Sequence, residues 1–202
     1  MEAMPKKQAK KAKSAGLPLK DRLVDSAFAL AATQGWALTS ARDIAENADV
    51  NLAEFYDAFD CKEDILLAYG RKLDRLVLEA FSEPHPETPV RDLIFDILME
   101  RFDLANKDKP AIKSIFSSFR TDPGLLLFST SHLGASMSRM LEAAGVSVNG
   151  LSGAARVAGL TTIVVWVTKI WLEDESPDLS KTMAALDKAL SKIENIADRF
   201  NL

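Results

Sequence analysis

Few side chains in this sequence have the spacing that catalysis requires. His85 and His132 lie far apart, and no glycine-rich phosphate loop, Ser-His-Asp set or group of metal ligands accompanies them. The single cysteine, Cys61, excludes a disulfide framework within the chain and favours a reducing, cytoplasmic setting. We therefore expect a protein that is not an enzyme and that has no metal or cofactor.

The residues from 39 to 62 have instead the pattern of a recognition motif. Thr39 or Ser40 can cap a short helix, and Asp49 can form the turn after it. Asn51 can cap a second helix, with Glu54 three positions later completing a capping box. Two short helices joined by a tight turn are typical of a helix-turn-helix, which presents its second helix to the major groove of DNA.

The rest of the sequence predicts an all-α fold, because apolar residues recur at helical spacing and paired strand patterns are nearly absent. Three prolines, Pro84, Pro86 and Pro89, should end a helix that is long enough to join two domains. Beside the two short helices we predict helices over Pro18–Gln34, Lys62–Phe81, Val90–Asn106, Pro110–Phe119, Gly124–Ala144, Leu151–Leu172 and Asp178–Phe200.

These elements predict three parts of the chain. Residues 1–17 should form a disordered basic arm, 18–62 a helix-turn-helix head, and 63–202 a helical domain for ligand binding and dimerisation. The arm contains Lys6, Lys7, Lys10, Lys11 and Lys13. The longest uncharged apolar run, 157–168, is shorter than the roughly 20 residues that a membrane-spanning helix needs, so no membrane span is expected.

The last two predicted helices should form a hairpin. The first helix is apolar on most sides, so most of its surface must be buried against other helices. The second helix has one regular apolar stripe. Paired with a second copy, the hairpin would form a four-helix homodimer interface, although an internal pair of core helices is an equal alternative. The residues predicted at the interface are Ile163, Val167, Ile170, Met183, Leu186, Leu190 and Ile193.

The head resembles the TetR family over Leu19 to Ala68. The residues that carry the resemblance are Thr39, Ile44, Ala45, Ala48, Val50, Phe55, Tyr56, Phe59, Lys62, Glu63, Ile65 and Leu66, in order and without a gap. The resemblance implies a ligand-responsive, DNA-binding transcriptional repressor that acts as a homodimer, with phosphate contacts from Thr39 and Tyr56 and with Lys62 anchoring the next helix. The DNA-binding residues that it implies are Thr39, Ser40, Arg42, Asn51, Leu52, Ala53, Glu54, Tyr56 and Lys62.

The head departs from the family pattern at positions that matter for DNA. Asp49 replaces the usual turn glycine, Asn51 the serine cap, Ala53 a small glycine and Ala58 a histidine. Asp and Asn tolerate the turn geometry, so the fold should survive. Residues 19–62 nevertheless contain four basic against eight acidic residues, which is unfavourable for binding phosphates. Only the lysine arm counters this charge, and it could equally be a solvated tail.

A ligand pocket is expected among the C-terminal helices. Aromatic and sulfur-containing side chains could line it, and polar groups could fix an acidic or hydroxylated ligand, although core packing and surface ion pairs are the simpler roles. The candidates are Arg101, Phe102, Phe116, Phe119, Arg120, Phe128, His132, Met137, Met140, Arg156 and Trp166.

A second function is compatible with the same fold. The acidic recognition helix favours a lipid- or isoprenoid-binding protein that has lost sequence-specific DNA binding, and the segment from Trp171 to Thr182 resembles the TetR-like protein of ubiquinone biosynthesis. No amphipathic membrane helix follows Phe200, so we rank the DNA-binding regulator first.

Overall fold

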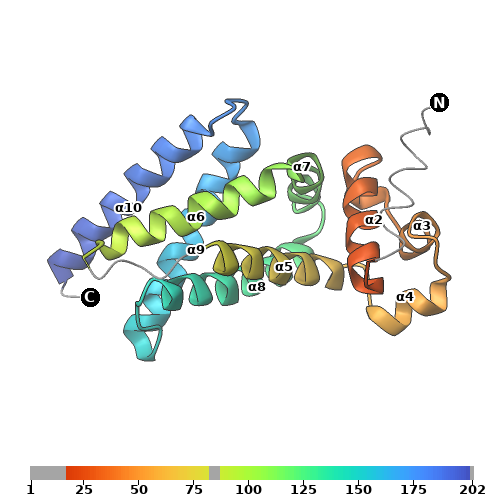
Figure 1. Ribbon diagram of the computed structural model, residues 1–202, viewed down its shortest axis with the longest axis horizontal. Coiled ribbons are helices and arrows are strands. Elements are labelled where there is room, and N and C mark those ends of the chain that lie inside the picture. The colour runs from red at the N-terminus through yellow and green to blue at the C-terminus, as the bar shows by residue number, and fades with distance from the viewer. Residues whose placement is uncertain (1–16, 82–86, 201–202) are drawn as a thin grey trace. The chain divides into compact units, whose positions relative to one another are not determined.

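The computed structural model describes residues 17–81 and 87–200, with side chains described as far as residue 193. Every regular element in these ranges is a helix, which confirms the all-α prediction. The lysines of the predicted arm, Pro84, His85 and Pro86 lie outside the described residues. The elements are α2 (Leu19–Thr33), η1 (Trp36–Leu38), α3 (Ala41–Asn47), α4 (Leu52–Ala58), α5 (Asp64–Ala80), α6 (Val90–Asn106), α7 (Lys109–Ser118), α8 (Pro123–Ala143), α9 (Gly150–Glu173) and α10 (Ser180–Phe200) (Figure 1).

The long predicted helices agree with the observed ones to within two residues at each end. One element was not predicted, the 3-10 turn η1. It follows Gly35, whose φ of 93° lies in the region that favours glycine, and it begins with Trp36, which is 1% exposed. A large buried aromatic side chain thus fixes a segment that has too few residues to show a helical period.

The chain divides into two compact units. The first unit contains the described residues up to Tyr69 together with Pro110–Asp122, and the second contains Gly70–Lys109 and the residues from Pro123 onward. The division therefore falls inside α5, seven residues later than the boundary expected after Lys62. Residues 110–122 join the first unit, where Ser114 Oγ accepts a hydrogen bond of 2.8 Å from the backbone N–H of Trp36.

The first unit is a small helical head with its own core. Leu23 and Ala27 of α2, Ile44 of α3, Phe55 of α4 and Ile65 of α5 are all fully buried. These residues come from four helices, so each helix directs its apolar side to a common centre. Figure 1 shows α2, α3 and α4 next to one another.

The second unit is a helical body in which α9 packs against α8 and α10, and α6 packs against α8 and α10. By length and composition α9 is the one helix in the described chain that could cross a membrane, with a mean hydropathy of 1.4 over its most apolar window. The core helix of a globular domain passes the same test. Here α9 contributes Leu160, Val164, Val167 and Trp171 to the core of the unit.

The connection between α9 and α10 is organised by one buried carboxylate. Asp174, which is 2% exposed, accepts hydrogen bonds from the backbone N–H and hydroxyl of Thr182, at 2.9 and 2.7 Å. It also accepts from the backbone N–H and the hydroxyl of Ser176. Burial opposes ionisation of Asp174, but these bonds outweigh it and hold the pKa of the carboxyl well below its usual value. The charged side chain therefore closes the hairpin.

Candidate nucleic-acid interface

A side chain from α2 binds the backbone of the turn between α3 and α4. Asp49 has a φ of 61°, so the aspartate adopts the left-handed conformation of the glycine that is usual at this position in the family. The Arg22 guanidinium donates to the carbonyl oxygens of Ala48, at 2.6 Å, and Asp49, at 3.2 Å. These bonds satisfy carbonyl groups at the end of α3 and fix the direction in which the chain enters α4.

A second clamp connects α2 to α3. The buried hydroxyl of Ser26 donates to the carbonyl of Ile44 at 2.9 Å and accepts from the side-chain amide of Asn47, also at 2.9 Å. No spacing rule links residue 22 or 26 to residues 44–49, so the sequence analysis missed these residues. Their signal is only that polar side chains interrupt the apolar side of α2.

Both short helices begin with the predicted caps. Ser40 caps α3 in a capping box with Asp43, whose carboxylate accepts from the backbone N–H and hydroxyl of Ser40. These bonds lower the pKa of Asp43. Asn51 caps α4 in a capping box with Glu54, with bonds of 2.9 and 2.8 Å, which confirms that prediction. Both boxes fix the starts of helices that are too short to be stable alone.

Thr39 and Lys62 have internal roles in the structure. Thr39 is 2% exposed, and its hydroxyl donates to the carbonyl of Gly35 at 2.8 Å, so the hydroxyl faces the protein rather than a phosphate. Lys62 Nζ donates to the carbonyl oxygens of Trp36, at 3.2 Å, and Thr39, at 2.9 Å. It also lies 5.0 Å from the centre of the Trp36 ring, so Lys62 anchors the segment before α3.

The outer side of α4 is exposed and acidic. Phe55 is buried, whereas Ala53, Glu54, Tyr56 and Asp57 are exposed. Tyr56 is 53% exposed, and its ring packs edge-on against Phe55. α4 thus presents two carboxylates and one phenol to solvent.

Few of the cations in the head are available to oppose this charge. Between residues 19 and 62, Arg22 and Lys62 bind carbonyl groups, and Lys20 lies 5.6 Å from the centre of the Phe59 ring. Arg42 is exposed on α3, where it lies beside Asp43. Any phosphate contact from this segment therefore depends mainly on Arg42 and Lys20, which are exposed, and on neutral donors.

The predicted ligand-binding residues fall into two groups. Phe116, Phe119 and Arg120 belong to the first unit, in which the two phenylalanine rings pack 5.2 Å apart and Arg120 is exposed. The other candidates belong to the second unit. There Phe102, Met137 and Met140 are buried, Phe128 packs against His132, Arg101 binds Asp74, Arg156 binds the Ser147 carbonyl, and Trp166 is 46% exposed.

The predicted dimer residues also divide into two groups. Ile163, Val167, Leu186 and Leu190 are buried within one chain, because α9 and α10 pack on each other. They form the internal core that the sequence analysis left as the alternative. Met183 and Ile193 are 43% and 37% exposed, Ile170 is half-buried, and the exposed Trp166 lies one turn before Ile170. These four residues, which we call the apolar surface of the hairpin, are exposed or half-buried apolar side chains on its two helices; Leu151 at the start of α9 is also exposed.

Comparison with known proteins identifies the type of helix-turn-helix in the head. Residues 23–69 match the family model of bacterial regulatory proteins of the tetR family. The match covers the helix-turn-helix and most of the described part of the first unit before residue 70. No curated protein matches the sequence.

Solved structures of tetR-type regulators share the fold. A TetR transcriptional regulator from Nitrosomonas europaea is 22% identical with a TM-score of 0.70, over 87% of this chain and 98% of that one. The fatty acid degradation regulator FadR from Bacillus halodurans is 22% identical with a TM-score of 0.61, over 86% and 95%. Thermus thermophilus FadR, a repressor in complex with lauroyl-CoA, is 21% identical with a TM-score of 0.51, over 85% and 91%.

These comparisons agree with the geometry of the head. The matched segment contains the capped α3 and α4, the left-handed turn at Asp49 and the exposed side of α4. The shared fold extends over both units of the chain. Residues 23–69 are therefore similar to the helix-turn-helix segment of tetR-type regulators, and the fold of the chain is the one that solved structures of such regulators have.

Proposed function

We propose that this protein is a cytoplasmic repressor that binds operator DNA as a homodimer and loses affinity for DNA when an apolar or amphipathic ligand binds the second unit. The observation that carries DNA binding is the exposed side of α4, which is held by its cap and by the α2 clamp on the preceding turn. A rigid, exposed second helix is what a helix-turn-helix needs to enter the major groove.

The proposed DNA contacts come from the starts of α3 and α4. Ser40 and Arg42 are exposed at the start of α3 and can contact phosphates. On α4, Asn51, Ala53, Glu54 and Tyr56 are exposed and Leu52 is half-buried, so these residues can approach base edges or the sugar-phosphate backbone. Thr39 and Lys62 act indirectly, because they position the segment that leads into α3.

The test is binding to a fluorescent duplex that contains the upstream intergenic DNA of its own gene, at several salt concentrations and with unrelated competitor DNA. Arg42→Ala should weaken binding and reduce the salt slope by about one phosphate contact, whereas the matched control Lys188→Ala, an exposed cation of the second unit, should change neither. Deletion of residues 1–16 measures the contribution of the lysine arm. Binding that is weak, indifferent to sequence and dependent only on the arm would reject the repressor proposal.

The homodimer is supported by the apolar surface of the hairpin. Trp166, Ile170, Met183 and Ile193 lie on α9 and α10 with exposed or half-buried side chains. Burial of such a surface in a second copy would extend the core of each chain. Trp166→Glu should therefore shift sedimentation equilibrium toward the monomer, and an unchanged dimer would show that another surface is used.

A ligand site in the second unit is supported by buried polar atoms that lack a partner among the described residues. They include the indole N–H of Trp171 and the side-chain carbonyl of Asn106. The Trp171 ring packs against Phe102, which lies one turn before Asn106 on α6. Buried polar groups without partners are unfavourable, and a ligand with one donor and one acceptor would satisfy both. The lauroyl-CoA complex of one structural neighbour supports an amphipathic ligand.

The second candidate function is lipid or isoprenoid binding on the same fold without reading of DNA. The observation that favours it is the acidic outer side of α4 in a head whose cations are mostly bound internally. The DNA titration decides between the two functions. If the protein ignores its upstream DNA, mass spectrometry of lipids that co-purify with it becomes the decisive measurement.

A further inference from the structure

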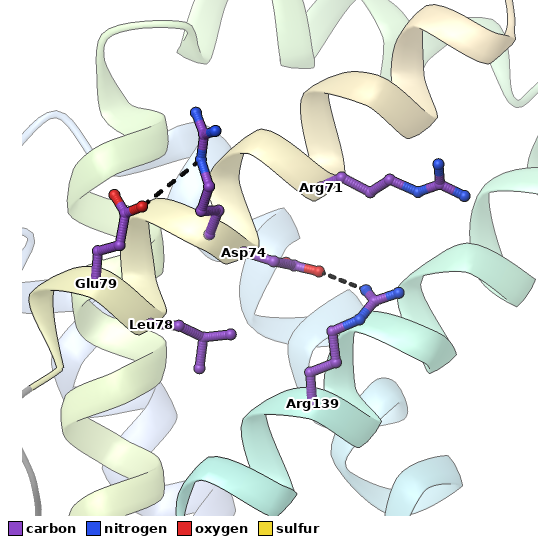
Figure 2. A pocket seen from close by; sticks show the side chains of 6 residues that line it. Arg71, Asp74, Leu78, Glu79 and Arg139 are labelled. Carbon is purple, nitrogen blue, oxygen red and sulfur yellow. Dashed lines mark hydrogen bonds and ion pairs between the residues drawn. The ribbon is translucent and has the colours of Figure 1, made fainter.

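Three of the six residues that line a groove in the second unit are arginines. It has a volume of about 470 Å³, within the range of roughly 300–1,000 Å³ that is usual for small-molecule sites. Figure 2 shows Arg139 extending from α8 to Asp74 on α5, and Arg71 extending from α5 at the same groove. The lining residues are Arg71, Asp74, Arg75, Leu78, Glu79 and Arg139.

The buried carboxylate of Asp74 organises this groove. The Asp74 side chain is 5% exposed and accepts hydrogen bonds from Arg101, at 2.7 Å, Arg139, at 2.8 Å, and Ser136, at 2.6 Å. The Arg101 side chain is only 12% exposed, so the charges of Arg101 and Asp74 neutralise each other inside the unit. Arg139 is bonded to Asp74 through one terminal nitrogen, and its side chain is 44% exposed.

The groove therefore has more positive than negative charge. Arg75 pairs with Glu79 at 3.8 Å, and both side chains are 65% exposed. Arg71 is exposed and forms no hydrogen bond or ion pair with any residue in the part of the chain that the structure describes. Arg71 and the outer nitrogens of Arg139 are thus donors directed at solvent, in a protein whose net charge is −4.

We propose that this groove binds the carboxylate or phosphate group of a small amphiphile, with the apolar part of the ligand against Leu78. Guanidinium groups match planar oxyanions because they offer paired N–H donors, and Asp74 holds Arg139 in position for such contacts. Leu78 is 37% exposed in the same groove. This site goes beyond the proposed function, because it differs from the interior site at Trp171 and requires no DNA.

Isothermal titration calorimetry of the full chain without DNA tests the proposal. The probes are octyl phosphate, octanoate, octanol, octyltrimethylammonium and inorganic phosphate at constant ionic strength. Octyl phosphate and octanoate distinguish the two oxyanions, octanol and the ammonium test the need for negative charge, and inorganic phosphate tests the need for the apolar chain.

Arg71→Gln is the main variant, because Arg71 is exposed and its loss should not affect folding. We expect it to weaken binding of at least one of the two anionic amphiphiles by about tenfold, as for one lost charge-assisted hydrogen bond. Arg139→Gln should have a similar effect, with its melting temperature measured in parallel because Arg139 also pairs with Asp74. Lys188→Gln, which removes an exposed cation elsewhere in the unit, should bind as the wild type does.

Three results would overturn the proposal. Unchanged binding of both anionic amphiphiles by Arg71→Gln would place them elsewhere. Equal affinity for octanol would remove the role of the arginines, and equal affinity for inorganic phosphate would remove the role of Leu78. Because DNA is absent, none of these results bears on the operator titration, so the site and the repressor proposal can fail separately.

Discussion

Two pairs of basic residues, one in the head and one in the body of this protein, differ in how their donors are used. In the head, Arg22 and Lys62 donate to backbone carbonyls, and the exposed side of α4 is acidic. In the body, Arg71 and Arg139 line an open groove with donors left for solvent. The difference teaches that counting cations along a segment does not measure its affinity for anions. The affinity depends on how many N–H groups of the basic side chains already form hydrogen bonds within the protein.

The largest effect should come from removing the carboxylate that organises the basic groove. Asp74→Ala removes the buried carboxylate that Arg101, Arg139 and Ser136 share, so we expect a loss of about 3–5 kcal/mol in the free energy of unfolding, measured by urea denaturation. Glu79→Ala on the same helix is the control and should cost less than about 1 kcal/mol, because its ion pair is exposed. Equal losses of unfolding free energy in the two variants would show that Asp74 does not stabilise the group formed by Arg101, Arg139 and Ser136.

The next effect concerns Asp174, a second buried carboxylate of the body. Asp174→Asn should reduce stability by about 2–3 kcal/mol near neutral pH, since charged hydrogen bonds are lost at the start of α10. Because the folded pKa is lowered, the wild-type advantage is complete above the usual value of 3.8 and decreases as the pH falls below it.

Melting temperatures of the two proteins from neutral to acidic pH measure this advantage. The difference in melting temperature between the wild type and Asp174→Asn should be constant above about pH 5 and become smaller in more acidic solution. The exposed neighbour Glu175→Gln serves as the control. A gap that stays the same down to acidic pH would mean that the charge of Asp174 does not stabilise the hairpin.

A smaller loss should follow from releasing the clamp in the head. Arg22→Gln removes the charged donor to the Ala48 and Asp49 carbonyls, so we expect a loss of about 1.5 kcal/mol in unfolding free energy. Operator affinity should decrease as well, because the turn that aims α4 becomes less fixed. A variant with full DNA binding would mean that the capping box of Asn51 suffices to orient α4.

The smallest change tests whether the acidic side of α4 opposes DNA. Asp57→Asn removes one exposed negative charge without affecting the cap, and we expect operator affinity to rise about two- to threefold at low salt. The gain should disappear as salt screens the charge. Fluorescence anisotropy at two salt concentrations measures it, with Asp103→Asn, an exposed carboxylate of the body, as control. A decrease in affinity would instead assign Asp57 a direct contact.

Local rules predicted most of the fold from the sequence. The capping box at Asn51 and Glu54 spans four residues, and the helix stripes repeat every three or four, so both can be read without knowing the tertiary structure. The clamps could not be predicted, because Arg22 reaches residues more than twenty positions away and its partners are carbonyl oxygens, which every residue has. The sequence also gave no reason to assign 110–122 to the head.

The interface and ligand predictions were limited by a different ambiguity. In the sequence, a buried apolar residue on α9 or α10 has the same pattern whether it packs on the other helix of its own chain or on a second chain. For this reason Ile163 and Leu186 were predicted at the dimer interface, with an internal pair of core helices as the equal alternative. Asp74 was missed because nothing in its neighbourhood distinguishes a buried carboxylate from a solvated one. Only the partners from α6 and α8 show the difference.

The backbone at Asp49 also determines which mutations a lineage can accept at this turn. A φ of 61° suits glycine, asparagine and aspartate, whereas β-branched side chains would be strained. Asparagine and glycine codons are each one nucleotide change away from aspartate codons, and either residue would remove a negative charge next to the recognition helix. Single mutations at this turn can therefore remove a negative charge beside α4 and leave the shape of the head intact.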